Sequence, residues 1–324
     1  MMIVTNRTIQ GLFLACALIT PVAVSAQGYP SKPVRLILPV PPGGVGDLVA
    51  RQLAQRLSQH WGQQVLIDHR AGATGLIGLG LAAKAPPDGY TLLWGSSNNM
   101  SMNPALLGKP SPAKDYAAIT PVVTFPNILV VHPSLPVKSM KELLALARNH
   151  PGKLRFGSAG NGSTNHLSAE VLQSQTGVRI THVPYKGGGP ALIDLLGGHI
   201  EAQFATSPSG MSYIRAGKLK PLMVTSATRL TALPAIPSAP EAGVPNLVVS
   251  TWNGIFAPAA TADNLTGALH AAITAALGNK EMTERIVAQA AEVYLLAPDA
   301  FAAMIDKEHA FWSGVVKKLN LQME

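Results

Sequence analysis

The sequence predicts an α/β fold with two doubly wound domains that are joined by a hinge. Three observations lead to this prediction. Residues 34–97 alternate between short apolar runs and helical patterns, which is typical of a parallel sheet with helices on both faces. Residues 127–226 repeat this alternation, including a glycine turn that leads into a helix. The final segment, 262–319, shows only helical periodicity, so its helices need a sheet formed elsewhere in the chain.

The first unit is a strand, a glycine turn and a helix. Val34–Val40 is apolar and is stopped by Pro41-Pro42, which fits a strand buried on both faces. Asp47 is placed to cap the following helix and Gly62 to end it. Apolar residues recur every four positions between them: Val49, Leu53, Leu57 and Trp61.

The turn at Gly43-Gly44 is a candidate anion site. A glycine turn before a helix presents free backbone N–H groups and the positive end of the helix dipole. The alternative is that Gly43 and Gly44 only make a tight connection between strand and helix. Asp47 has two interpretations as well, since it either caps the helix or faces an ammonium or hydroxyl group of a ligand.

Further strands and helices follow this unit. Gln64–His69 and Thr91–Ser97 are expected as strands, with a glycine turn at Arg70–Gly75 and a helix at Leu76–Lys84 between them. Ligands of such sheets lie at the carboxyl ends of the strands, and the loops there are rich in Gly, Ser or Asn. The strands expected in the second half are Asn127–His132, Leu154–Ala159, Arg179–Tyr185, Ile200–Ala205 and Leu219–Ser226. The helices expected there are Met140–Asn149, Asn165–Thr176, Gly189–Leu196 and Pro208–Ala216, with Ser139 and Glu142 forming a capping box for the first.

The C-terminal helices are expected at Ala262–Leu277, Lys280–Ala290 and Pro298–Leu319, after an extended segment at Val248–Phe256. Because they need a sheet to cover, we expect the chain to cross between domains near Val131 and to return near Trp252. The predicted domains are therefore 27–131 with 252–324, and 132–251.

Residues 1–26 have the pattern of a signal peptide. Arg7 supplies a positive charge, Ile9–Val24 is apolar, and the small residues at Val24-Ser25-Ala26 predict cleavage after Ala26. A transmembrane anchor is the alternative, but the apolar run is shorter than about 18 residues and contains a proline. Cys16 lies inside this run, so the mature chain has no cysteine, no disulfide and no thiol nucleophile.

Composition and motifs exclude several function classes. The formal net charge is +8 over 324 residues, and loss of Arg7 with the leader lowers it by one. This excess of positive charge either favours acidic small ligands or only keeps the surface soluble. No basic run or aromatic ladder indicates nucleic-acid binding. No P-loop, dinucleotide fingerprint or G-x-S-x-G motif occurs, so no cofactor is expected. The nine histidines lack metal spacing, so no metal is expected, and His166 and His182 are interpreted as helix-surface or packing residues.

The turns rich in amides and hydroxyls favour binding without conversion, because backbone N–H groups at two helix starts can hold a carboxylate. The following motifs together resemble the Bug-type solute-binding proteins of tripartite tricarboxylate transport systems: PPGGVGD (41–47), AGATGLIG (71–78), PPDGYTLLWG (86–95), GSAGNGSTNHL (157–167), HVPYKGGGPALIDLLGGHI (182–200), AGKLKPLMVTS (216–226) and PEAGVP (240–245). The similarity covers the chain after the signal peptide.

The resemblance implies a monomeric periplasmic binding protein of the Venus-flytrap type, which holds a small organic carboxylate in a cleft between two α/β domains. It also implies delivery to the membrane subunits of a tripartite tricarboxylate transporter, or signalling to a sensor kinase. The ligand-binding residues that it implies are Pro42, Gly43, Gly44, Asp47, Ala73, Thr74, Gly160, Ser163, Thr164 and His166.

Three positions depart from the family pattern. Gly46 stands where Thr or Ser is usual, His69 stands where Asn is usual, and Ala205-Thr206 replaces a frequent Asp-Asn or Asp-Ser pair. The missing acid at Ala205 favours a simple mono- or dicarboxylate, aromatic acids included, over an amino acid. Two alternatives stay open: a secreted hydrolase or isomerase that uses Ser163, His166 and Asp47, and a periplasmic ligand sensor without transport.

Overall fold

The computed structural model describes residues 28–42, 45–72 and 75–319. The predicted signal peptide, with its cleavage site after Ala26, lies outside the described residues. So do four of the predicted ligand-binding residues, which are Gly43, Gly44, Ala73 and Thr74.

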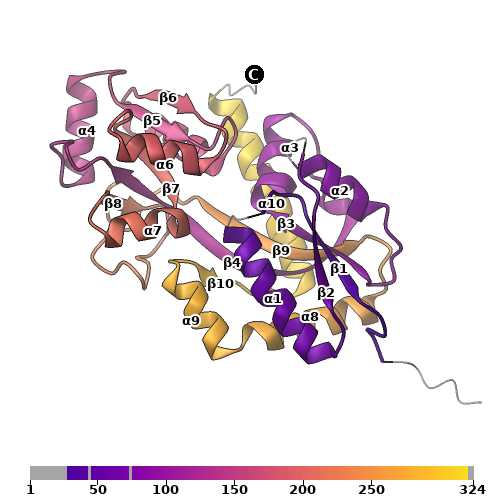
Figure 1. Ribbon diagram of the computed structural model, residues 1–324. Coiled ribbons are helices and arrows are strands. Elements are labelled where there is room, and N and C mark those ends of the chain that lie inside the picture. Colours follow the sequence, from indigo (N-terminus) through magenta and orange to yellow (C-terminus); the bar gives the residue numbers. More distant parts are fainter. Residues whose placement is uncertain (1–27, 43–44, 73–74, 320–324) are drawn as a thin grey trace, which may run out of the picture.

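Ten strands of the described chain form one mixed sheet in the order β2-β1-β3-β9-β4-β7-β5-β6, and β8 and β10 also pair with β4 (Figure 1). The strands are β1 (Val34–Leu38), β2 (Val65–His69), β3 (Thr91–Ser96), β4 (Tyr116–Val131), β5 (Arg155–Ser158), β6 (Thr181–Pro184), β7 (Ala202–Thr206), β8 (Lys220–Val224), β9 (Ser250–Pro258) and β10 (Glu292–Val293). The predicted α/β class is confirmed.

The sheet has two halves that share β4. The first half holds β1, β2, β3, β9, β10 and residues 116–126 of β4, and the second holds β5 to β8 and residues 127–131 of β4. In the first half β1 is parallel to β2 and β3, and in the second β5 is parallel to β6 and β7. Each half therefore contains the parallel units that the alternating pattern predicts.

The strand β4 corrects the sequence prediction, which begins it only at Asn127. Residues 116–126 also belong to it and pair antiparallel with β9. This segment contains Pro121 and Pro126, and proline cannot donate to a β-ladder. The register shifts on both sides of Pro121, and such irregularities let a strand accommodate proline.

Helices cover both faces of the sheet. They are α1 (Val45–Trp61), α2 (Leu76–Ala83), α3 (Asn103–Leu106), α4 (Met140–Asn149), α5 (Thr164–Thr176), α6 (Gly188–Leu196), α7 (Ser207–Arg215), α8 (Asp263–Leu277), α9 (Lys280–Ala288) and α10 (Pro298–Leu319), with single turns at η2 (Asn98–Met102) and η3 (Pro112–Asp115). None of the helices in the described ranges is long and apolar enough to cross a membrane.

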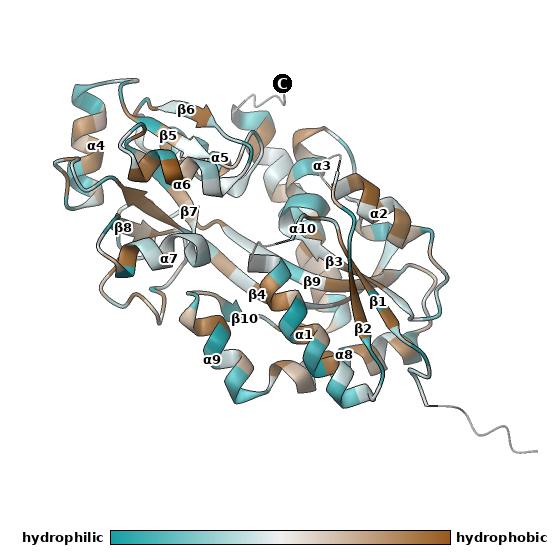
Figure 2. Ribbon diagram, viewed as in Figure 1, coloured by the Kyte–Doolittle hydropathy of each residue, from teal (hydrophilic) through white to brown (hydrophobic). Residues whose placement is uncertain are grey.

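The strand β1 shows how the layers form. Leu36 and Leu38 pack in one core cluster with α1 and α8, whereas Ile37 packs on the opposite face with α2 and α10. The prediction of a strand buried on both faces is confirmed, and Figure 2 shows β1 as an apolar strand.

The helix α10 contacts both halves of the sheet. Near its start, Phe301 and Ile305 pack with Trp252 and Phe256 of β9. Further along, Trp312 packs in the core cluster of the second half. Figure 1 shows this helix, in yellow, running past both groups of strands.

Two smaller expectations are wrong. The final segment does not consist of helices alone, because β10 pairs with Thr124 and Val123 of β4. The helix α1 begins at Val45 rather than at Asp47, so Asp47 lies in its first turn and not at its N-cap position.

Candidate ligand-binding site

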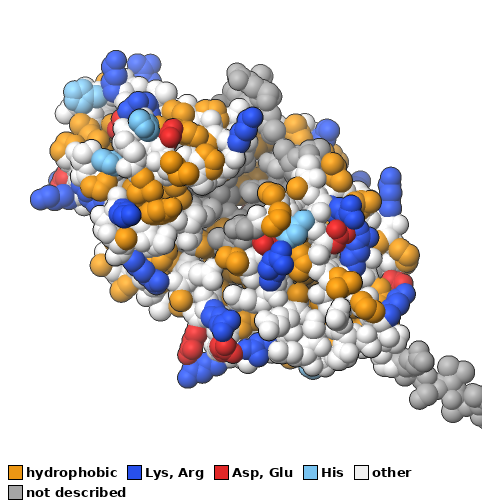
Figure 3. Space-filling model, viewed as in Figure 1, with side chains coloured by type: hydrophobic (Ala, Val, Ile, Leu, Met, Phe, Trp, Pro, Cys, Tyr) orange, Lys and Arg blue, Asp and Glu red, His pale blue; other side chains and the backbone are white. Residues whose placement is uncertain are grey.

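A cavity of about 330 Å³ lies where the two halves of the sheet meet. Its lining comes from the ends of β1, β3 and β5, from the starts of α1 and α5, and from β9. The lining residues are Pro39, Val40, Pro41, Pro42, Gly46, Asp47, Trp94, Ser96, Asn98, Asn99, Phe125, Ala159, Ser163, Thr164, Asn165, Thr206, Thr251 and Asn253. Figure 3 shows the surface hollowed between the two halves.

The cavity lies at the carboxyl ends of two parallel units, as expected for an open α/β sheet. The strand β5 leads through residues 159–163 into α5, whose first backbone N–H groups have no acceptor within the helix. Ser163 caps this helix, since its hydroxyl accepts from the His166 N–H at 3.3 Å and donates to the Gly160 carbonyl at 2.7 Å. Gly160 has a φ of 114°, which only glycine adopts readily.

Asp47 is held by the protein rather than left to the solvent. Its Oδ1 forms an ion pair with Arg51, whose Nε lies 3.0 Å away, and His69 Nε2 lies 3.1 Å from the same oxygen. The other ring nitrogen of His69 lies 2.9 Å from the carbonyl oxygen of Val40. His69 therefore joins the end of β2 to the first turn and to the start of α1.

Asparagine side chains tie the second half together beside the cavity. Asn165 donates through its Nδ2 to the Phe204 carbonyl and, at 3.4 Å, to Asn127 Oδ1. Asn127 in turn donates to Ser168 Oγ at 3.1 Å. These bonds fix α5 against β4 and β7, so the start of α5 has a defined place relative to the strand that both halves share.

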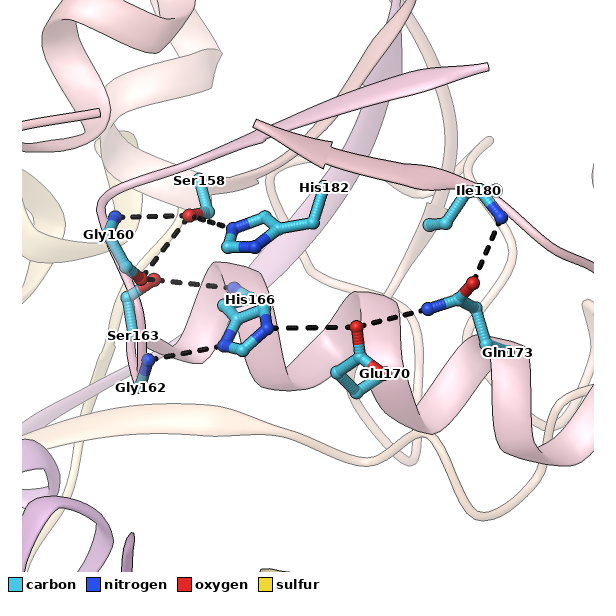
Figure 4. Close-up of polar contacts among 9 residues, drawn as sticks. All are labelled: Ser158, Gly160, Gly162, Ser163, His166, Glu170, Gln173, Ile180 and His182. Carbon is cyan, nitrogen blue, oxygen red and sulfur yellow. Dashed lines mark hydrogen bonds and ion pairs between the residues drawn. The ribbon is translucent and has the colours of Figure 1, made fainter. Parts of the chain in front are cut away.

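His166 and His182 lie behind the α5 turn, as Figure 4 shows. Their rings stack with centroids 4.0 Å apart. His182 Nε2 lies 2.6 Å from Ser158 Oγ, and His166 Nδ1 accepts from the Gly162 N–H at 3.2 Å. Burial and the neighbouring His182 lower the pKa of His166 to about 4, and burial also lowers the pKa of His182. The stacked pair therefore supports the turn as two neutral rings.

The structure brings Pro42, Asp47, Ser163 and Thr164 together around the cavity. Gly160 and His166 instead lie in and behind the turn that carries Ser163 and Thr164. The sequence reasoning missed Trp94, Thr206, Thr251 and Asn253, which lie on strands that meet only in the folded protein. The segment after β3 is rich in Ser and Asn, which points to a ligand site at this end of the strand. Asn98 and Asn99 of this segment do line the cavity.

The hydroxyl of Ser163 bonds to the Gly160 carbonyl and the His166 backbone N–H rather than to an imidazole. It is therefore not arranged as a nucleophile next to a base. Among the described residues, no group of three or more His, Cys, Asp or Glu is arranged to hold a metal ion.

Comparisons with known proteins agree with this geometry. A family model described as the tripartite tricarboxylate transporter family receptor matches residues 49–321. Protein BugT of Bordetella pertussis is 37% identical over 319 residues, which are 97% of each chain. The structure of R. palustris Rpa4515 with adipate matches with a TM-score of 0.82 and 35% identity, covering 91% of this chain and 99% of that one.

A second solved structure, MatC from Rhodopseudomonas palustris with bound malate, matches with a TM-score of 0.78 and 29% identity, covering 89% of this chain and 100% of that one. The family model and the relatives extend over nearly the whole length that shows the sequence resemblance. The chain belongs to the tripartite tricarboxylate transporter receptor family, the Bug-type solute-binding proteins, and has a periplasmic binding protein fold.

Proposed function

We propose that this protein captures a small organic carboxylate in the cavity between the two halves of the sheet, in the periplasm, and binds it without converting it. The observation that carries the proposal is the meeting of two helix starts, α1 and α5, at one cavity. Of the described residues that line this cavity, none is Lys or Arg, so backbone N–H groups and neutral side chains are the donors for an anion. The related structures that contain adipate and malate support a carboxylate ligand.

The proposed binding residues are those that the resemblance implies. Ser163 and Thr164 contribute from the start of α5, and Pro42 and Asp47 from the first turn and the start of α1. Gly160 and His166 hold the shape of the turn before α5. Gly43, Gly44, Ala73 and Thr74 remain part of the proposal as backbone donors of the first and second glycine turns.

Closure of two domains is the proposed mechanism. The change of partners along β4 between Pro126 and Asn127, and the start of β9 at Ser250, support a division near residues 131 and 252. A ligand that touches both domains only when they are closed shifts the equilibrium between open and closed forms. The closed monomer then delivers the ligand to the membrane subunits of a tripartite tricarboxylate transporter, or is read by a sensor kinase.

Binding is tested on the chain from Gln27 onward, unfolded and refolded to remove retained ligand. Isothermal titration calorimetry is run with mono-, di- and tricarboxylates, aromatic acids, amino acids and sugars. We expect one class of carboxylates to bind with micromolar affinity, about −8 kcal/mol. Binding of a sugar or an amino acid in preference to every carboxylate would contradict the proposal, as would turnover of any bound compound.

The backbone donors are tested at Thr164, the first residue of α5. Proline is tolerated at this helix position, and Ser163 before it has φ −71° and ψ 157°, which suits a residue that precedes proline. Thr164→Pro removes one N–H, and we expect it to weaken carboxylate binding by about tenfold or more, as charge-assisted hydrogen bonds are strong. Thr164→Val is the matched control, because it loses the hydroxyl but keeps the N–H. Equal affinity in both variants would show that the α5 N–H does not hold the ligand.

A further inference from the structure

Two of the buried polar atoms that line the cavity have no hydrogen-bond partner among the described residues. They are Nε1 of Trp94, a donor, and Oδ1 of Asn253, an acceptor. Trp94 is only 1% exposed and Asn253 only 7%, and both residues line the cavity. Buried polar atoms are nearly always paired, so an unpaired donor and an unpaired acceptor in one cavity need a partner from outside the chain.

The two atoms lie on the same face of the sheet. Asn253 of β9 is directly opposite Ser96 of β3, and Trp94 is two residues from Ser96 along its strand. Trp94 and Asn253 are therefore diagonal neighbours across an antiparallel pair, on the face that α1 covers.

Gly46, in the first turn of α1, lies over both atoms. A Cβ at this position would be 3.1 Å from Trp94 Nε1 and 3.4 Å from Asn253 Oδ1. The absent side chain therefore leaves a small space that the donor and the acceptor both border.

We propose that this space binds a hydroxyl group of the ligand, so that the preferred ligand is a hydroxycarboxylate and Gly46 determines this specificity. One hydroxyl can accept from Trp94 Nε1–H and donate to Asn253 Oδ1 at the same time. A second carboxylate fits less well, because an ionised carboxylate has no proton to donate to Asn253 Oδ1. An unsubstituted methylene leaves both atoms unpaired, which is costly in a buried site. This inference rests on the proposed carboxylate function.

The test uses pairs of acids that differ by one hydroxyl: succinate and each enantiomer of malate, glutarate and 3-hydroxyglutarate, and butyrate and each enantiomer of 3-hydroxybutyrate. Affinities are measured by calorimetry on the refolded chain from Gln27. We expect the hydroxylated acid to bind at least about tenfold more tightly in the pair whose length fits the cavity, which is about 1.4 kcal/mol. Equal or weaker binding of the hydroxylated acid in every pair that binds would overturn the inference.

Two variants test whether the preference for a hydroxylated ligand arises at the space beside Gly46. Gly46→Ala fills the space and Trp94→Phe removes the donor. We expect each variant to bind the hydroxylated acid less than about threefold more tightly than the matching acid without the hydroxyl. Gly267→Ala is the control for the first, because a Cβ there meets nothing within 4 Å. Trp312→Phe is the control for the second, because Trp312 is also buried, at 2% exposed, but does not line the cavity. Both controls should keep the hydroxyl preference of the wild type. A wild-type hydroxyl preference in Trp94→Phe would show that the ligand hydroxyl does not bind to Trp94 Nε1.

The outcomes separate this inference from the proposed function. Carboxylate binding without a hydroxyl preference contradicts only the role of Gly46, Trp94 and Asn253. If no carboxylate binds to the refolded wild type, the proposed function fails and the hydroxyl site fails with it.

Discussion

His166 and His182 make the stability of this protein depend on pH. The pKa of His166 is lowered from 6.5 to about 4, mainly by burial, and the pKa of His182 is lowered as well. Between these pH values the unfolded chain binds a proton that the folded chain refuses, so stability is lost as pH falls from 6.5 to 4. We expect the melting temperature of the ligand-free protein to drop by several degrees over this range, measured by calorimetry.

Glu170 acts in the opposite direction, because burial raises its pKa and the folded state then binds its proton more readily. Its Oε1 lies 3.7 Å from His166 Nε2, so His166→Gln is the informative variant. The variant should flatten the pH dependence, whereas His60→Gln, an exposed residue at the end of α1, should not change it. If the melting temperature of His166→Gln depends on pH as strongly as that of the wild type, the stacked pair is not the source of the pH dependence.

The helix α10 is anchored on the sheet by Phe301, which is fully buried against Trp252 and Phe256. The absence of a side chain at Gly254 makes room for this ring, since a Cβ there would be 2.6 Å from it. We expect Phe301→Ala to lower the free energy of unfolding by about 3–5 kcal/mol, measured by urea titration. Phe311→Ala on the same helix is the control, because Phe311 is 49% exposed and should cost little. A loss below about 1 kcal/mol in Phe301→Ala would show that α10 packs loosely.

At the scale of the whole molecule, binding should change the shape. The cavity is lined from both halves of the sheet, so a ligand gains its full set of contacts only when these halves approach. We expect a smaller radius of gyration in X-ray scattering when a saturating carboxylate is added. Thr164→Pro at the same ligand concentration is the control and should stay nearer to the unliganded value. Scattering that is unchanged while calorimetry reports binding would contradict domain closure.

Much of this protein follows from local sequence. The helix α4 has the predicted bounds, and Ser139 accepts from the Glu142 N–H as the capping pattern indicates. The glycine turn before α5 and the end of α1 before Gly62 follow from backbone conformations that glycine adopts most readily. The motifs also predict the family correctly, because these turns follow one another in a characteristic order along the chain.

Other features were decided only by tertiary structure. The first part of β4 becomes a strand because β9, more than a hundred residues later, pairs with it in spite of two prolines. Asp47 is held by His69, His166 stacks on His182, and Trp94 comes to lie beside Asn253. Sequence periodicity carries information about neighbours within a helix or strand. It does not show which distant side chains share a cavity, because that depends on the order and register of strands in the folded sheet.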